Sequence, residues 1–149
     1  MRSLGLDVGD RRIGVAISGP HGLLAVPLSV IAKSEDAARE NIIKLVKQHR
    51  IERIVIGLPR SLNGGLGQQA NKVIAFTDKL SLRVQQSNIG QIDIELWDER
   101  FSTVAAERLM VEVGTKREKR NQRRDAIAAS FILQGFLDSR HSEQKEGTV

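Results

Sequence analysis

Residues 3–18 read Ser-Leu-Gly-Leu-Asp-Val-Gly-Asp-Arg-Arg-Ile-Gly-Val-Ala-Ile-Ser, and the rest of the architecture can be worked out from them. Apolar residues alternate with others on both sides of Gly9-Asp10, which is the signal of a β-hairpin. One face of this hairpin carries leucine, valine and isoleucine. The other carries small residues and a single carboxylate, Asp7. A third alternating run at 24–31 contains Pro27, which favours the edge of a sheet, so the chain is predicted to begin with an antiparallel meander.

The hydrophobic period changes after residue 33. Apolar residues at helical spacing predict a helix that begins near Ser34. The continuous apolar run at 53–58 is typical of a central strand that is covered on both faces. We also expect helices at 70–84, 102–113 and 126–137, and a strand at 92–96. Right-handed crossovers place the later strands parallel to the first.

These elements predict one α/β domain over residues 1–138. Its sheet has five strands and is mixed, with antiparallel strands first and parallel strands after them, and helices pack on both faces. Residues 139–149 are polar, and we expect them to form a disordered tail.

The composition excludes several classes of protein. A chain of 149 residues is long enough for one domain. The absence of cysteine excludes disulfide scaffolds, thiolate metal sites and cysteine nucleophiles, and it fits a reducing cytosol. No apolar run has the length of a membrane span and no secretory signal is visible, so we expect a cytoplasmic protein with no membrane partner. Only five aromatic residues are present, which argues against a sheet that stacks bases on a row of rings.

The positive charge is concentrated in one short stretch. Six of the 23 basic residues and one of the 18 acidic residues fall within residues 115–124, and the remaining 17 of each sign balance. The basic residues are Lys116, Arg117, Lys119, Arg120, Arg123 and Arg124. We interpret the stretch as a loop that contacts a polyanion, with nucleic acid as the first candidate. The alternative is a solvated, highly charged loop.

Three carboxylates stand at positions where chemistry is plausible. Asp7 lies near the end of the first strand among glycines, which leave space above it. Glu99 follows the fifth strand, and Asp125 opens the last helix directly after the basic stretch. Each also has a plain structural explanation: a turn cap for Asp7, a helix cap or an ion pair with Arg100 for Glu99, and a helix-start acid or a pair with Arg123 or Arg124 for Asp125.

If the ends of the first and fifth strands converge, these acids form one cluster. Three unprotonated carboxylates repel one another, so such a cluster needs a metal ion or raised pKa values. Oxygen ligands favour Mg²⁺ or Mn²⁺. Two such ions, bound together with substrate, would serve an in-line displacement at phosphorus. The sequence therefore offers a metal-dependent phosphodiesterase as one hypothesis.

Four segments carry a resemblance to a known family. They are Leu6-Asp7-Val8-Gly9 with Arg12-Ile13-Gly14-Val15-Ala16, Val55-Ile56-Gly57-Leu58-Pro59 with Gly64, Asp98-Glu99-Arg100-Phe101-Ser102-Thr103 with Ala106-Glu107, and Asp125 with Ala128-Ala129 and Ile132-Leu133. In this order and spacing they resemble the YqgF-like family of RNase H-like proteins, known both as pre-16S rRNA nucleases and as Holliday-junction resolvases. The resemblance implies an RNase H-like fold, with Asp7, Glu99 and Asp125 as catalytic and metal-binding acids.

The first functional hypothesis is a metal-dependent endonuclease that processes the 5′ end of pre-16S rRNA. We expect its nucleic-acid contacts to come from the basic stretch together with Arg11, Arg12, Arg60 and Arg100. A four-way DNA junction is the alternative substrate, and a non-catalytic RNA-binding assembly factor is a lesser one. Asp7 to Gly14 also resembles the first phosphate motif of actin-like and sugar-kinase ATPases, but the chain has no room for their second lobe.

Overall fold

The computed structural model describes residues 1–59, 66–99 and 117–146. Its strands are β1 (Ser3–Val8), β2 (Arg12–Ser18), β3 (Ala25–Ala32), β4 (Arg53–Leu58) and β5 (Asp93–Asp98). Its helices are α1 (Glu35–His49), α2 (Gln68–Gln86) and α4 (Arg117–Glu146). The helix expected at 102–113 lies outside the described residues. All the other predicted elements are present, and their boundaries differ by a few residues except in α4, which extends nine residues beyond the predicted helix at each end.

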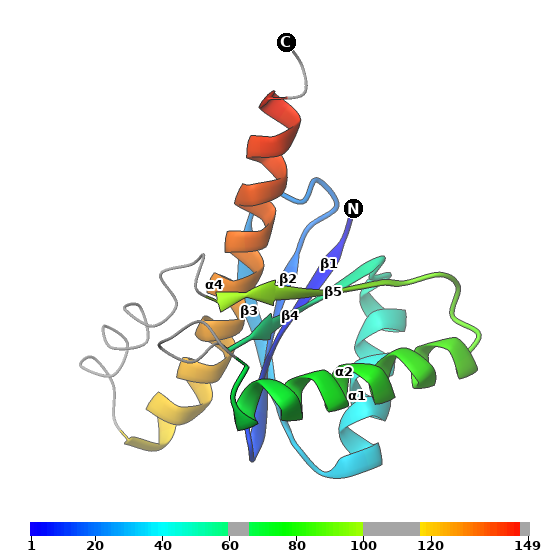
Figure 1. Ribbon diagram of the computed structural model, residues 1–149, viewed down its shortest axis with the longest axis vertical. Helices are drawn as coiled ribbons and strands as arrows, with labels where there is room; N and C mark the ends of the chain where they lie inside the picture. Colours follow the sequence, from blue (N-terminus) through cyan, green and yellow to red (C-terminus); the bar gives the residue numbers. More distant parts are fainter. Residues whose placement is uncertain (60–65, 100–116, 147–149) are drawn as a thin grey trace.

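The five strands form one mixed sheet in the order β3-β2-β1-β4-β5 (Figure 1). β1 pairs antiparallel with β2, and β2 pairs antiparallel with β3. β1 and β4, and then β4 and β5, pair in parallel. This arrangement confirms the predicted fold class, and Pro27 lies on the edge strand β3, as expected. The carboxyl ends of β1, β4 and β5 consequently meet at one edge of the sheet.

Helices cover both faces of the sheet (Figure 1). The larger core lies between the sheet and the pair α1 and α2, and it contains Leu4, Leu6 and Val8 of β1. The smaller core lies under α4 and contains Ala16, Val55 and apolar residues of α4. Arg83 of α2 donates a hydrogen bond to Glu40 of α1, which lowers the pKa of the Glu40 carboxyl and ties the two helices together. None of the described helices has the length and apolar character needed to cross a membrane.

Small residues let α4 approach the sheet closely. A Cβ added to Gly5 would lie 2.7 Å from Leu133 Cβ, and one added to Gly14 would lie 1.8 Å from the carbonyl oxygen of Asp125. No side chain fits in the second position, because the obstacle is helix backbone rather than the end of a side chain. α4 therefore packs against the small-residue face of the first hairpin.

The basic stretch and the tail are the places where the prediction was wrong. Residues 117–124 belong to α4 rather than to a loop. They contain neither glycine nor proline and are rich in good helix formers, so they extend the apolar segment that follows them. Residues 139–146 are also helical instead of disordered. Arg140 pairs with Glu95 at 2.9 Å and His141 Nε2 lies 2.9 Å from the Gly22 carbonyl oxygen, so tertiary contacts hold this polar end in place.

Candidate functional site

Asp7 lies in a row of residues that crosses the sheet. Its neighbours in β1, Leu6 and Val8, are buried in the α1–α2 core, so Asp7 faces the opposite side, which α4 covers. In the β1–β2 ladder Asp7 stands opposite Gly14. In the β1–β4 ladder Leu6 pairs with Ile56, and Asp7 and Gly57 are the residues that follow these two on adjacent parallel strands. The carboxylate therefore stands between two glycines on the α4 side of the sheet.

Asp125 reaches this row from α4. Its backbone lies directly over Gly14, because a Cβ added to that glycine would lie only 1.8 Å from the Asp125 carbonyl oxygen. Its side chain accepts a hydrogen bond from Arg12, with Nε to Oδ2 at 2.7 Å, and it is 19% exposed against 37% for Arg12. The expected partners of this carboxylate were Arg123, Arg124 or a cation. The structure shows a partner that was not expected, Arg12 of β2, which is distant in the sequence.

Glu99 reaches the same row from the other side. It follows β5 directly, and a Cβ added to Gly57 would lie 2.8 Å from Glu99 Oε1 and 2.5 Å from Ile132 Cδ1 of α4. The Glu99 side chain therefore rests on the sheet at Gly57, on the face that α4 covers. A larger residue at position 57 would displace it.

The three predicted acids thus approach one short stretch of the sheet. Adjacent strands lie about 4.8 Å apart, so Gly14 and Gly57 are separated by about 10 Å with Asp7 between them. Asp125 approaches at the first glycine and Glu99 at the second. Topology explains the convergence, because β1 and β5 run in the same direction and end at the same edge.

The chemistry of these side chains suits a divalent metal ion. Carboxylate oxygens are the ligands that Mg²⁺ and Mn²⁺ prefer. Within the described ranges, however, no three His, Cys, Asp or Glu side chains are gathered closely enough to hold an ion as they stand. The hydrogen bond from Arg12 occupies one oxygen of Asp125. The chemistry of the donor set fits a metal ion.

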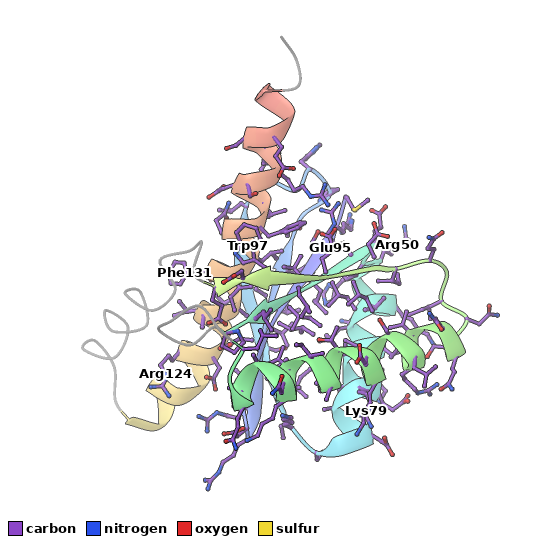
Figure 2. The ribbon with its side chains drawn as sticks, in the orientation of Figure 1. Arg50, Lys79, Glu95, Trp97, Arg124 and Phe131 are labelled. Carbon is purple, nitrogen blue, oxygen red and sulfur yellow. The ribbon has the colours of Figure 1, made fainter. Side chains whose placement is uncertain are left out.

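A basic groove of about 340 Å³ adjoins the acids. Its lining includes Asp125 and three of the arginines expected to contact nucleic acid, namely Arg11, Arg12 and Arg124. Arg124 lies in the first half of α4 (Figure 2). The other predicted contact residues are not described in side-chain detail: Arg60, Arg100 and Lys116 lie outside the described ranges, and for Arg117, Lys119, Arg120 and Arg123 only the helical backbone is described.

Sequence reasoning missed a second basic hollow, between α1 and α2. It is lined by Lys33, Arg39, Lys72 and Lys79. Three separate segments supply these residues, so no single stretch of sequence displays them together. The available signal was the seven-residue spacing of Lys72 and Lys79, which places both on one face of a helix.

The order and directions of the strands define the class to which the structure belongs, the RNase H-like fold. The structure is similar to that of RuvC of Thermus thermophilus, solved in complex with a Holliday junction substrate. The TM-score is 0.57 at 14% identity, and the match covers 95% of this chain and 96% of that one. This likeness establishes the fold.

The chain belongs to the RuvX Holliday junction resolvase family, whose family model matches residues 1–139. A protein of Clostridium botulinum is 46% identical over 140 residues, covering 93% of this chain and 98% of the relative. A protein of Desulforamulus reducens is 41% identical over the same coverage. Both are named "Putative pre-16S rRNA nuclease". The family inferred from the four sequence segments is confirmed, and with it the class of enzyme, a hydrolase of phosphodiester bonds.

Proposed function

We propose that this protein is a metal-dependent endonuclease whose substrate is precursor 16S rRNA and whose reaction trims its 5′ end in the cytoplasm. The observation that carries the proposal is the row Gly14-Asp7-Gly57, which Asp125 and Glu99 approach from opposite sides. The names of the relatives in Clostridium botulinum and Desulforamulus reducens support the choice of substrate.

Asp7, Glu99 and Asp125 are the residues that would hold Mg²⁺ or Mn²⁺, with two ions bound together with substrate. When bound, the ions supply Lewis-acid stabilisation of charge at phosphorus and lower the pKa of a bound water. The two glycines let Asp125 and Glu99 lie against the sheet on either side of Asp7. Arg12 holds the carboxylate of Asp125 in place beside the sheet through its hydrogen bond to Oδ2.

The basic groove is the proposed path of the nucleic-acid backbone next to the acids. Arg11 is exposed and Arg124 is half-buried, and both line the groove that contains Asp125. Cations beside a nuclease site attract the phosphates that flank the scissile bond, and they contribute affinity that falls with added salt. The basic residues at the start of α4 would continue this surface, and we assign them affinity rather than chemistry.

The second candidate function is resolution of a four-way DNA junction. The family description and the fold shared with RuvC favour it. Structured RNA is preferred here because the groove beside the acids covers only a short length of backbone, whereas a junction presents four arms. A symmetric dimer would double the basic surface and would place two sites on one junction.

One assay separates these functions. Purified protein is incubated with an end-labelled precursor 16S rRNA leader and with a four-way DNA junction at equal salt, with Mg²⁺ and with EDTA, while sedimentation measures the oligomeric state. We expect Mg²⁺-dependent cleavage of the leader and no symmetric pair of nicks in the junction. Paired nicks made by a stable dimer, with the leader intact, would establish the second function. Tight RNA binding without cleavage would indicate a non-catalytic assembly factor.

A further inference from the structure

A hollow of about 310 Å³ lies between α1 and α2, on the face of the sheet opposite α4. Four cations line it: Lys33, which follows β3, Arg39 of α1, and Lys72 and Lys79 of α2. Among the described residues of the lining Asp10 is the one acid, and the buried ring of Phe76 forms part of the wall. Four positive charges against one negative charge around an open hollow favour an anionic ligand.

Two of these cations have no ion-pair partner among the described residues. Lys72 pairs with Asp10 at 3.3 Å, and Arg39 pairs with the highly exposed Asp36. Neither Lys33 nor Lys79 makes an ion pair within the described part of the chain, and Lys79 is exposed (Figure 2). The internal ion pairs of the fold therefore do not account for these two lysines.

The hollow adjoins the basic groove next to the acids. Asp10 lines both of them, and the backbone N–H of Lys33 donates to the Arg11 carbonyl oxygen at 2.9 Å. The β1–β2 turn, which carries Asp10, is thus common to both hollows. It stands at the carboxyl end of β1, where ligands of open α/β sheets bind. A polyanion that crosses this turn would contact the two hollows in succession.

The spacing of the lysines favours a polymer over a single phosphate. Lys72 and Lys79 are seven residues apart on α2, which separates them by about 10 Å along the helix. Cations spread over this distance match successive phosphates of a nucleic-acid strand better than they match one phosphate group. We propose that this α1–α2 hollow binds backbone phosphates of the substrate at a distance from the scissile bond, on the far side of the β1–β2 turn. The inference rests on the proposed function for the identity of the polyanion.

Binding in EDTA tests the proposal without any need for cleavage. The double variant Lys33→Gln with Lys79→Gln is compared with a control, Lys44→Gln with Lys47→Gln, which removes the same charge from exposed positions of α1 outside the hollow. The probes are a fluorescent precursor-rRNA leader with a stem and a single-stranded arm, and a four-way DNA junction. Fluorescence anisotropy gives Kd from 50 to 200 mM salt, a range of the order that resolves counterion release.

We expect the first variant to bind the RNA roughly 5- to 20-fold more weakly at the lower salt concentration. The slope of log K against log salt should fall by roughly 1.4 for single-strand contacts and roughly 1.8 for duplex contacts. The control variant should keep the wild-type slope to within about 0.3. If the first variant loses affinity for the DNA junction and not for the RNA, the hollow binds DNA. Equal losses of affinity in both variants, or wild-type affinity and slope in the first variant, would overturn the proposal. Binding of poly-glutamate that the first variant loses and the control variant keeps would also overturn it.

The outcome is separable from that of the proposed function. If the leader is not cleaved in Mg²⁺ but the slope of the first variant falls as expected, the hollow binds nucleic acid in a protein that is not a nuclease of this RNA. If the leader is cleaved and the slope is unchanged, the nuclease function stands and the hollow has no part in it.

Discussion

Arg12 Nε donates a hydrogen bond to Asp125 Oδ2 at 2.7 Å, across 113 residues of sequence. The bond joins β2 to α4 directly beside Gly14, where the helix backbone meets the sheet. It holds a carboxylate on the α4 side of the row that contains Asp7. The Asp125 side chain is mostly buried and the Arg12 side chain is about one-third exposed. The exposure of this pair is therefore intermediate between that of a surface ion pair and that of a buried one.

The coupling between these two side chains should be measurable. In a double-mutant cycle with Arg12→Gln and Asp125→Asn, we expect a coupling free energy of about 1 kcal/mol in urea unfolding without metal. The exposed pair of Lys72 and Asp10, at 3.3 Å, serves as the control and should give less than about 0.5 kcal/mol. Equal couplings in the two cycles would show that Arg12 does not hold Asp125 more firmly than a surface pair would.

The three acids should be required for cleavage and not for folding. Asp7→Asn, Glu99→Gln and Asp125→Asn should each reduce Mg²⁺-dependent cleavage by about 100-fold or more. The double variants should be scarcely worse than the single ones, because all three residues are proposed to serve one site. Asp93→Asn, at the amino end of β5, is the matched control and should retain activity. Turnover within a few-fold of wild type in any one acid variant would remove that residue from the proposed set.

The melting temperature separates the roles of two of these acids. Asp125→Asn loses the charge that Arg12 pairs with and should melt at a lower temperature without metal. Asp7→Asn removes a negative charge from the neighbourhood of two other acids and should melt at the wild-type temperature or above it. Differential scanning calorimetry in EDTA measures both.

The glycines beneath α4 should tolerate a methyl group to very different degrees. Gly14→Ala places a Cβ 1.8 Å from helix backbone, so we expect it to cost about 3 kcal/mol or more, or to prevent folding. Gly57→Ala meets the ends of the Ile132 and Glu99 side chains, which can shift. Its cost should be about 1–3 kcal/mol, with a larger effect on cleavage because Glu99 is displaced.

Gly19→Ala is the control for this series, because no atom lies within 4 Å of its added Cβ. It should change the free energy of unfolding by no more than about 0.5 kcal/mol. Urea titrations of the three variants rank the sites. A Gly14 variant as stable as the Gly19 variant would contradict the close passage of α4 over β2.

The sheet and the approach of the acids could be predicted because local patterns determine them. The alternation of residues 3–18 separates the face that carries Leu4 and Leu6 from the face that carries Asp7, and the buried run at 53–58 indicates a central parallel strand. Carboxylates near the ends of strands that run in one direction then fall at one edge. These inferences need only the hydrophobic period, which can be counted in the sequence, and the right-handedness of crossover connections, which is a general rule.

The remaining features depend on contacts between distant segments. The polar end of α4 was expected to be disordered, and it is held by partners 45 and 119 residues away, Glu95 for Arg140 and Gly22 for His141. The pairing of Asp125 with Arg12 could not be distinguished from pairing with its sequence neighbours. The cations of the α1–α2 hollow come from three segments and gather only after the helices dock on the sheet. Local propensity carries no information on such contacts.

The basic residues of 116–124 lead along the sequence into the groove that Arg124 and Asp125 line. Residues 117–124, which belong to α4, include five basic residues and one acid. This local excess of positive charge favours a polyanion partner.

Neutralising this stretch should therefore weaken binding without weakening the fold. In the quadruple variant of Lys116, Arg117, Lys119 and Arg120 to Gln, the melting temperature should change little, because glutamine has nearly the same helix propensity as lysine and arginine. The slope of log K against log salt should fall by roughly 0.7 for each phosphate of a single strand that is no longer neutralised and by roughly 0.9 for each phosphate of a duplex, with cleavage at saturating RNA retained. Lys44→Gln with Lys47→Gln again controls for net charge. A wild-type salt slope in the quadruple variant would show that the stretch is only a solvated helix end, and a loss of cleavage at saturating RNA would place it in the chemistry instead.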